Sequence, residues 1–270
     1  MRMNSILTVV DLTKKYGQFT AARKINFSVA GGSIVGLLGP NGSGKSSVLH
    51  CVTGVIGVTS GAIIINGHPH QTAAAKAMLG FVPDDLALPT NLTGAEYLDL
   101  IRRLQPSCDR SLMAELLDLL GLTGALGKLV AEYSHGMKRK MQMVAAMSHS
   151  PSLLILDEPF RGLDPEAHLI LRTLIDSFVA TGGGALVATH DMAEAQAYCD
   201  EISIFADGEI AAAGTPAALM AEYERSSLEE VFLAAAGIEE RTKHIQERIG
   251  EIQLDVGRAR TELRHERSVA

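Results

Sequence analysis

The sequence has little of several residue types that particular functions require. Tryptophan is absent and aromatic residues make up only 4% of the 270 residues, which argues against a surface that stacks nucleic-acid bases. The formal net charge of -7 provides no general positive field for DNA or RNA. We therefore expect no nucleic-acid partner.

Cysteines and long apolar runs are also scarce. Cys51, Cys108 and Cys199 are far apart and form no C-x-x-C pair, so we expect three reduced thiols in a cytosolic protein. No apolar run approaches the roughly 18–20 residues that span a bilayer. The first residues lead into a strand-like run and not into a signal-peptide core. The composition predicts a soluble chain whose membrane role comes only through a partner.

The most informative segment that is present covers residues 39–46, which read G-P-N-G-S-G-K-S and match G-x-x-x-x-G-K-[ST]. Glycines let backbone N–H groups curl around phosphate oxygens, and the helix that begins near Gly44 points its positive end at the same anion. Lys45 adds charge for the β- and γ-phosphates, and the Ser46 hydroxyl suits Mg²⁺. We predict a site for a nucleoside triphosphate and Mg²⁺ whose loop residues are Gly39, Asn41, Gly42, Ser43, Gly44, Lys45, Ser46 and Ser47.

Short β-forming runs surround this segment in the N-terminal third. Residues 33–38 are a short, mostly apolar run that predicts a buried strand directly before the loop. Residues 7–12, 25–29 and 62–65 are further β-forming runs, and Asn66-Gly67 is a strong hairpin signal. These runs predict an antiparallel sheet beside the phosphate-binding unit.

The pattern changes in the C-terminal half. The apolar runs 153–156 and 185–188 flank residues 165–180, which have helical periodicity. This order predicts a βαβ unit and a parallel sheet. Residues 202–205 and 209–212, joined by an Asp-Gly pair, predict a terminal hairpin.

A mostly helical insertion is predicted between these halves, from about residue 84 to about residue 148. Residues 92–104 and 111–120 carry apolar positions at helical spacing. Thr93 and Ser111 are the expected N-caps of these helices.

Two charged stretches lie elsewhere. The basic run Lys138-Arg139-Lys140 begins a helix, and we expect it on a solvated face.

In the tail, apolar or small residues alternate at spacings of four and three, which indicates a heptad seam. That seam predicts a coiled-coil partner for residues 238–263 or, alternatively, one amphipathic helix packed on its own domain. Its positions are Ile238, Thr242, Ile245, Ile249, Ile252, Val256, Ala259 and Leu263.

A second chemical motif follows the apolar run at 153–156. Asp157 and Glu158 end this predicted strand. A carboxylate at a strand tip is placed to hold Mg²⁺, directly or through water, and its neighbour is a candidate base for the attacking water. Together with the phosphate-binding loop, the pair indicates nucleotide hydrolysis.

With these motifs the chain resembles the nucleotide-binding subunit of ABC transporters over residues 5–235. Further motifs follow in the family's order. Tyr16 matches the aromatic that stacks on adenine, and the segment Ser134-His135-Gly136-Met137 matches the signature. Gly162-Leu163-Asp164-Pro165 matches the D-loop, and Thr189-His190-Asp191 matches the switch histidine.

The resemblance implies a role for each matching residue. Ser134 and Gly136 are expected to meet the γ-phosphate of nucleotide held by a second subunit, and Asp164 to shape that interface. His190 is expected to contact the γ-phosphate and Glu158, so Glu158 and His190 are the catalytic candidates. ATP then joins two subunits and hydrolysis releases them.

Two departures from the family pattern stand out. His135 and Met137 replace the signature's first Gly and last Gln, in a form familiar from the exporter-like subgroup often called ABC-2. Asp84 stands where the family has the Q-loop glutamine. A carboxylate still binds Mg²⁺ but cannot donate hydrogen bonds, so Ser46, Asp84 and Asp157 are the expected metal ligands.

The overall prediction is an α/β fold with a P-loop NTPase (RecA-like) core, an antiparallel β-subdomain, an α-helical subdomain and a C-terminal helical extension. The domains are residues 1–236 and 237–270. The function is ATP hydrolysis for an ABC transporter, in a homodimer or a heterodimer with a related subunit. Its partner is a membrane permease, and its place is the inner face of the cell membrane. The alternative is a non-transport nucleotide switch or scaffold whose heptad tail recruits a partner.

Overall fold

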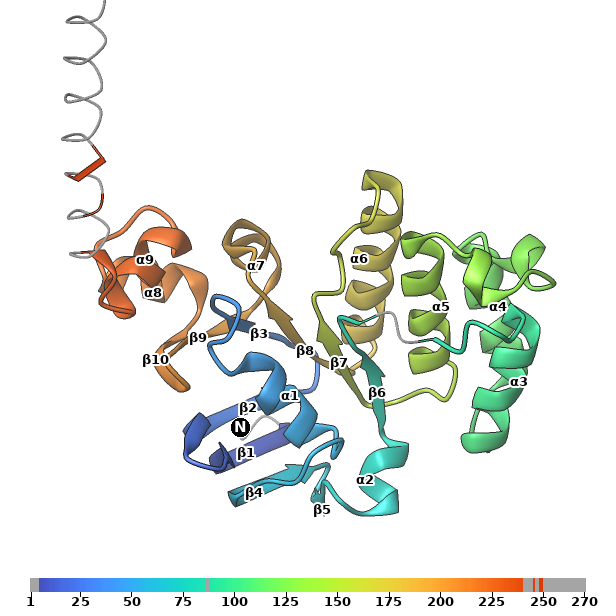
Figure 1. The fold of residues 1–270 in the computed structure, drawn as a ribbon, viewed down its shortest axis with the longest axis horizontal. Helices are drawn as coiled ribbons and strands as arrows, with labels where there is room; N and C mark the ends of the chain where they lie inside the picture. The colour runs from blue at the N-terminus through green and yellow to red at the C-terminus, as the bar shows by residue number, and fades with distance from the viewer. Residues whose placement is uncertain (1–4, 86–87, 240–244, 246–247, 250–270) are drawn as a thin grey trace, which may run out of the picture.

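The computed structural model describes residues 5–85, 88–239, 245 and 248–249, and it contains two β-sheets with helices between and around them (Figure 1). The smaller sheet is antiparallel, with four strands in the order β2-β1-β4-β5. This confirms the antiparallel sheet predicted for the N-terminal third. Its strands are β1 (Ser5–Tyr16), β2 (Phe19–Ala30), β4 (Ser60–Ile65) and β5 (His68–Pro69).

The larger sheet has six strands in the order β10-β9-β3-β8-β7-β6. Its pairs are parallel from β9 to β6, and only the edge strand β10 runs antiparallel. The predicted βαβ unit is thus confirmed as β7, α6 and β8. The six strands are β3 (Ile34–Leu38), β6 (Leu79–Val82), β7 (Leu153–Asp157), β8 (Gly184–Thr189), β9 (Glu201–Ala206) and β10 (Glu209–Gly214).

The central strands of this sheet are buried on both faces, which explains their continuous apolar sequences. Along β7, Leu153 and Ile155 face one hydrophobic core, whereas Leu154 and Leu156 face the other. Every residue of β3, β7 and β8 is buried. The carboxyl ends of these strands are therefore held rigidly at one edge of the sheet.

Helices cover both faces of the six-stranded sheet. α1 contacts strands of both sheets, and α6 packs its buried residues into the core on the opposite face. The helices outside the insertion are α1 (Lys45–Val52), α2 (Ala73–Ala77), α6 (Pro165–Ala180), α7 (Met192–Tyr198), α8 (Pro216–Glu222) and α9 (Leu228–Ala235).

The helical insertion contains α3 (Gly94–Leu104), α4 (Arg110–Leu119) and α5 (His135–Met147). Thr93 is the N-cap of α3 as predicted, in a capping box with Glu96. The prediction of Ser111 as the cap of α4 is wrong. Asp109 caps this helix, because its Oδ1 accepts hydrogen bonds from the Ser111 and Leu112 N–H groups at 2.7 and 3.3 Å.

Among the described residues, none of the helices combines the length and apolarity needed to cross a bilayer. The predicted heptad positions beyond Ile238 lie almost entirely outside the described residues. The division at residue 236 therefore stays a prediction, although α9 ends just before it, at Ala235.

Candidate functional site

A cavity of about 380 Å³ lies where the carboxyl ends of β3 and β7 meet the start of α1. Clefts at this edge of a parallel sheet are the usual ligand sites of open α/β folds. The cavity brings together residues predicted from motifs that are far apart in the sequence. They are Tyr16, Asn41, Gly42, Gly44, Lys45, Ser46, Ser47, Asp84, Asp157 and Glu158.

The phosphate-binding loop connects β3 to α1 through a conformation that needs glycine. Gly44 caps α1 with a φ of 108°, and a Cβ there would lie 2.2 Å from the Ala21 carbonyl oxygen. The buried Lys45 ammonium donates hydrogen bonds to the carbonyl oxygens of Gly39 at 2.6 Å and Pro40 at 3.1 Å. Burial lowers the pKa of Lys45, and the Glu158 and Asp157 carboxylates oppose that shift.

Asp157 ends β7 beside the loop. Burial raises the pKa of its carboxyl, a hydrogen bond with the Ser46 side chain lowers it, and the nearby Asp84 and Glu158 carboxylates raise it further. The Asp157 carboxylate and the Ser46 hydroxyl supply hard oxygen atoms that suit a divalent cation. Among the described residues, no group of three or more His, Cys, Asp or Glu side chains is placed to hold a metal ion.

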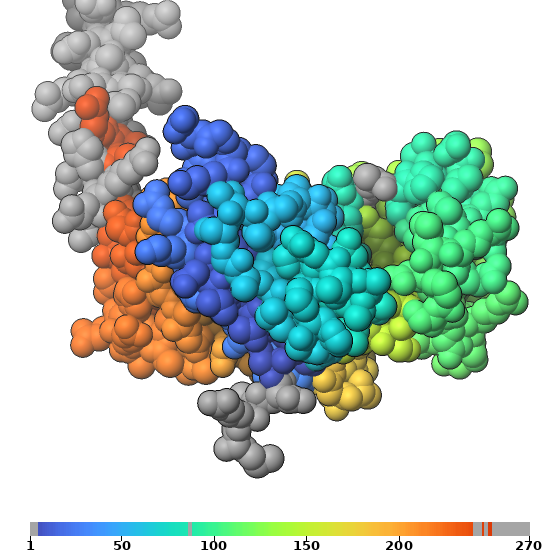
Figure 2. All heavy atoms as spheres, turned by 90° about the horizontal axis from the view of Figure 1, so that it is seen from below, coloured from blue at the N-terminus to red at the C-terminus, as the bar shows by residue number. Residues whose placement is uncertain are grey.

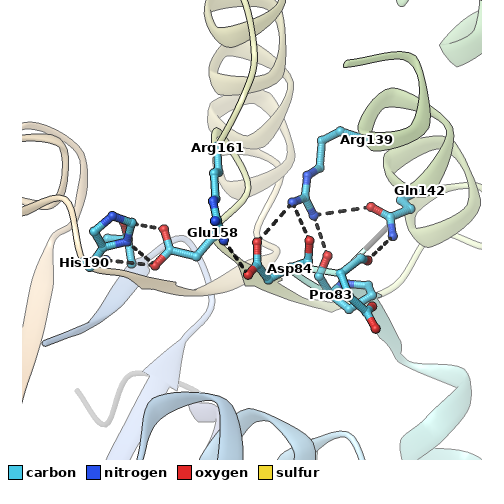
Figure 3. Close-up of polar contacts among 9 residues, drawn as sticks. Pro83, Asp84, Arg139, Gln142, Glu158, Arg161 and His190 are labelled. Atoms are coloured by element: carbon cyan, nitrogen blue, oxygen red, sulfur yellow. Dashed lines mark hydrogen bonds and ion pairs between the residues drawn. The ribbon is translucent and has the colours of Figure 1, made fainter. Parts of the chain in front are cut away.

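Glu158 is held by three hydrogen bonds from the end of β8 (Figure 3). Its Oε1 accepts from the His190 backbone N–H at 3.0 Å and lies 2.6 Å from His190 Nδ1. Its Oε2 accepts from the Thr189 hydroxyl at 3.2 Å. Glu158 has a φ of 49°, which is a strained conformation for a non-glycine residue. The structure thus brings the two catalytic candidates into contact, although His190 lines an adjacent cavity.

Asp84 lies at the same cavity, but its carboxylate contacts arginines (Figure 3). Oδ2 accepts from the Arg161 Nη1 at 2.9 Å, and Oδ1 lies 3.6 Å from the Arg139 Nη2. The expectation that the run 138–140 lies on a solvated face is wrong for Arg139, whose side chain is only 3% exposed. Tertiary packing decides this, because its guanidinium also donates to the Pro83 and Asp84 carbonyl oxygens.

The predicted residues Ser134, Gly136 and Asp164 lie at helix starts outside the cavity, and the loop residues Gly39 and Ser43 do not line it either. Ser134 caps α5, where its hydroxyl accepts from the Met137 N–H at 3.2 Å, and Gly136 lies in the first turn of α5. Asp164 caps α6, and its Oδ1 accepts from the Ala167 N–H at 2.8 Å. Local capping alone explains these two caps, so their roles across a subunit interface stay predictions.

Sequence analysis missed several residues at the site. Thr189 donates a hydrogen bond to Glu158, and its position beside His190 in the Thr189-His190-Asp191 motif is the sequence signal that could have predicted it. Phe19 and Arg161 line the cavity. Phe19 pairs with Tyr16 across the β1–β2 hairpin, which only the strand register reveals. Arg161 lies three residues after Glu158, in the turn between the Asp157-Glu158 motif and the Gly162–Pro165 motif.

Taken together, the fold and this cavity define a P-loop nucleotide-binding protein. The family model described as "ABC transporter" matches residues 22–161, and a model described as "AAA domain, putative AbiEii toxin, Type IV TA system" matches residues 129–195. The chain belongs to the ABC transporter ATP-binding family, and it is an ATP-binding subunit of that type.

Relatives and solved structures agree with this assignment. The chain is 33% identical over 240 residues to the Linearmycin resistance ATP-binding protein LnrL of Bacillus subtilis, covering 87% of this chain and 76% of the relative. It is 34% identical to the Nod factor export ATP-binding protein I of Paraburkholderia xenovorans, covering 81% and 74%. The structure titled "Structure of ATP binding subunit of ABC transporter" matches with a TM-score of 0.80 and 31% identity, covering 85% and 99%. These matches favour transport over the nucleotide-switch alternative.

Proposed function

We propose that this subunit hydrolyses ATP to ADP and phosphate in a Mg²⁺-dependent reaction and that Glu158 is its general base. The observation that carries the proposal is the position of Glu158, which is clamped by His190 and Thr189 at the rim of the phosphate-binding cavity. Three hydrogen bonds orient a carboxylate whose neighbours also include the buried Lys45.

The residues of the cavity fit MgATP. Gly44 lines the cavity at a position where a Cβ would meet the Ala21 carbonyl oxygen, and no side chain caps the N-terminal N–H groups of α1, which suit phosphate oxygens. Asp157 and Ser46 supply hard oxygen ligands, and Mg²⁺ bound there would neutralise charge on the β- and γ-phosphates. Tyr16 is half exposed and lines the cavity, where its ring would stack on adenine.

The charged residues of the site then have separate roles. Lys45, freed from the Gly39 and Pro40 carbonyl oxygens, binds phosphate oxygens. Glu158 accepts a proton from the attacking water at a carboxylate oxygen, and His190 keeps that carboxylate in position through its Oε1 contact. His190 is half exposed, and its contact with the γ-phosphate stays a prediction from the family resemblance. Asp84 as a third metal ligand stays a prediction, because both its oxygens contact arginines.

We also propose that two subunits close on ATP, in a homodimer or with a related subunit. Ser134 and Gly136 begin α5 away from the cavity of their own chain, where its N-terminal N–H groups suit an anion on a second chain. Asp164 begins α6 in the same way and would line that interface. The proposed assembly explains why the signature residues do not line their own subunit's phosphate site.

The face for a membrane permease is proposed at a second cavity, of about 250 Å³, between β6 and the helical insertion. Figure 2 shows a notch between the cyan surface that follows the antiparallel sheet and the green surface of α3 and α4. An apolar lining fits an amphipathic helix of the permease. The apolar lining includes Leu79, Phe81, Pro83, Leu88, Tyr97 and Ile101. The subunit would thus lie on the inner face of the membrane, and its named relatives in resistance and export favour an exporter.

The test is the ATPase activity of Glu158→Gln in the full chain, measured as phosphate release together with nucleotide binding. Turnover should fall by roughly 10²–10⁴-fold, the usual contribution of a general base, while ATP still binds. Glu166→Gln, an acid in the first turn of α6, is the matched control and should keep wild-type turnover. Wild-type turnover in Glu158→Gln would contradict the proposed base.

Two further measurements test the assembly. Because the site is completed by a second subunit, turnover per chain should fall on dilution, whereas ATP binding should persist. A membrane protein encoded beside this chain should co-purify with it. Turnover that stays constant per chain on dilution would contradict the shared site.

A further inference from the structure

Asp84 lines the phosphate cavity and joins the loop after β7, which also lines it, to helix α5, which does not. Its carboxylate accepts a hydrogen bond from Arg161, in the loop between β7 and α6, at 2.9 Å. Its other oxygen lies 3.6 Å from the Arg139 guanidinium, which belongs to α5. A single carboxylate thus lies between two guanidinium groups (Figure 3).

Arg139 fixes the backbone around Asp84. Its guanidinium donates to the Pro83 carbonyl oxygen and, at 3.0 Å, to the Asp84 carbonyl oxygen. One turn further along α5, Gln142 donates to the Asp85 carbonyl oxygen at 2.9 Å. Buried side chains of α5 therefore hold the Asp84 segment in place before its carboxylate makes any contact.

Arg161 is placed beside the reacting groups. Its backbone N–H donates to the Glu158 carbonyl oxygen at 3.2 Å, and its side chain lines both the phosphate cavity and the cavity of His190. The side chain is 63% exposed, so burial does not hold it. Its hydrogen bond to Asp84 is the contact that directs the guanidinium along the cavity wall.

We propose that Arg161 is a further cation of the hydrolysis site, facing the phosphates of bound ATP, and that Asp84 is the positioning residue that holds it there. The inference rests on the proposed ATPase function. A guanidinium at this wall stabilises the negative charge that spreads over the γ-phosphate oxygens during transfer.

The chemistry of Asp84 suits this role. A carboxylate only accepts hydrogen bonds, so both its oxygens are compatible with guanidinium donors. An amide of the same shape would turn one NH₂ group toward an arginine and lose one of the two contacts. Asp84 and Arg161 therefore form a matched pair. Because both side chains are substantially exposed, the pair itself adds little to folding stability.

A double-mutant cycle in the full chain tests the pair through phosphate release. Asp84→Asn and Arg161→Gln should each lower kcat roughly tenfold and change KM for ATP by less than about threefold, because the cation acts mainly in the transition state. The double variant should also lose roughly tenfold and not roughly a hundredfold, because either change removes the same interaction. Arg161→Lys, which keeps the charge, should recover part of the loss.

The control is a second exposed ion pair, Arg23 on β2 with Glu209 on β10, at 3.2 Å. Arg23→Gln and Glu209→Gln should leave kcat unchanged. A Mg²⁺ titration separates the proposal from a direct metal role. The concentration for half-maximal rate should be the same in wild type and Asp84→Asn.

Three results would overturn the proposal. They are an unchanged kcat in Arg161→Gln, losses that multiply to roughly a hundredfold in the double variant, and a Mg²⁺ requirement raised by Asp84→Asn alone. The last result would make Asp84 a metal ligand. Failure of the proposed ATPase function gives a different result, because the Glu158→Gln variant would then release phosphate as fast as the wild type.

Discussion

The phosphate-binding loop and the border of the helical insertion face one cavity, but they are built in different ways. The loop is held by backbone: Gly44 has a φ of 108° and sits against the Ala21 carbonyl oxygen. The insertion border is held by side chains, with Arg139 donating to the Pro83 and Asp84 carbonyl oxygens. The loop therefore tolerates no added side chain at Gly44, whereas the insertion border depends on a few polar side chains that can be substituted.

This difference indicates a division of work. Backbone N–H groups that are held between the buried strand β3 and helix α1 provide a phosphate site that needs no rearrangement. Side chains that connect an insertion to the sheet edge provide a link that other contacts can shift. Changes in the loop should therefore abolish nucleotide binding, and changes at the border should affect stability or turnover while ATP still binds.

The largest expected effect is that of Gly44→Ala. The new Cβ meets a backbone oxygen at 2.2 Å in a conformation that L-residues avoid, so we expect a loss of about 3 kcal/mol in the free energy of unfolding. ATP affinity should be lost with it. Denaturant titration and nucleotide binding check both, with Gly127→Ala as control, since its Cβ would meet nothing within 4 Å. Normal ATP binding in Gly44→Ala would contradict the view that the loop backbone, unlike the insertion border, is required for nucleotide binding.

A smaller effect is expected for Arg139→Met, which keeps an unbranched apolar stem and removes the guanidinium with its donors. The Pro83 and Asp84 carbonyl oxygens lose their partner, so the free energy of unfolding should fall by about 2 kcal/mol. ATP affinity should change little, because Arg139 does not line the phosphate cavity. Denaturant titration beside Lys140→Met, on the same helix, isolates the effect of the lost bonds. A loss of ATP binding would show that the border also builds the phosphate site.

The smallest effect concerns the reactivity of thiols in the two regions. Burial raises the pKa of Cys199, packed behind β3, to about 12, so at pH 8 this group stays a thiol and alkylates slowly. Burial also raises the pKa of Cys51. Cys108, in the insertion, is half-buried and should be modified first. Mass spectrometry after iodoacetamide treatment of native and unfolded protein measures the order. Native-state labelling of Cys199 before Cys108 would contradict it.

Much of the fold was predictable because its periodicities are local. Continuous apolar runs predicted β7 and β8, and the Asn66-Gly67 and Asp-Gly pairs predicted two hairpins, where Asn66 and Asp207 have φ values of 46° and 50°. The cap of α4 was mispredicted because Asp109 and Ser111 both suit an N-cap. Only the backbone path selects one of them.

A site residue was predictable where its position is set by neighbours in the same short motif. Lys45 and Ser46 lie within the loop that positions them, and Glu158 lies at the tip of its own strand. The burial of Arg139 was not predictable, because its partners lie more than fifty residues away, at the Pro83 segment. A separation of 77 residues likewise kept the Asp84–Arg161 contact out of reach of local patterns.

The sequence by itself determined the family, the ATP-binding loop and the order of the catalytic motifs, because each of these resides in a short run of residues with its own chemistry. The tertiary structure alone decided which charges meet. It turned Asp84 toward two arginines, buried Arg139 and joined Glu158 to Thr189, whereas the contact of Glu158 with His190 was already expected from the family resemblance. Such contacts depend on how β6, α5 and the ends of β7 and β8 pack together, and no local pattern encodes that packing.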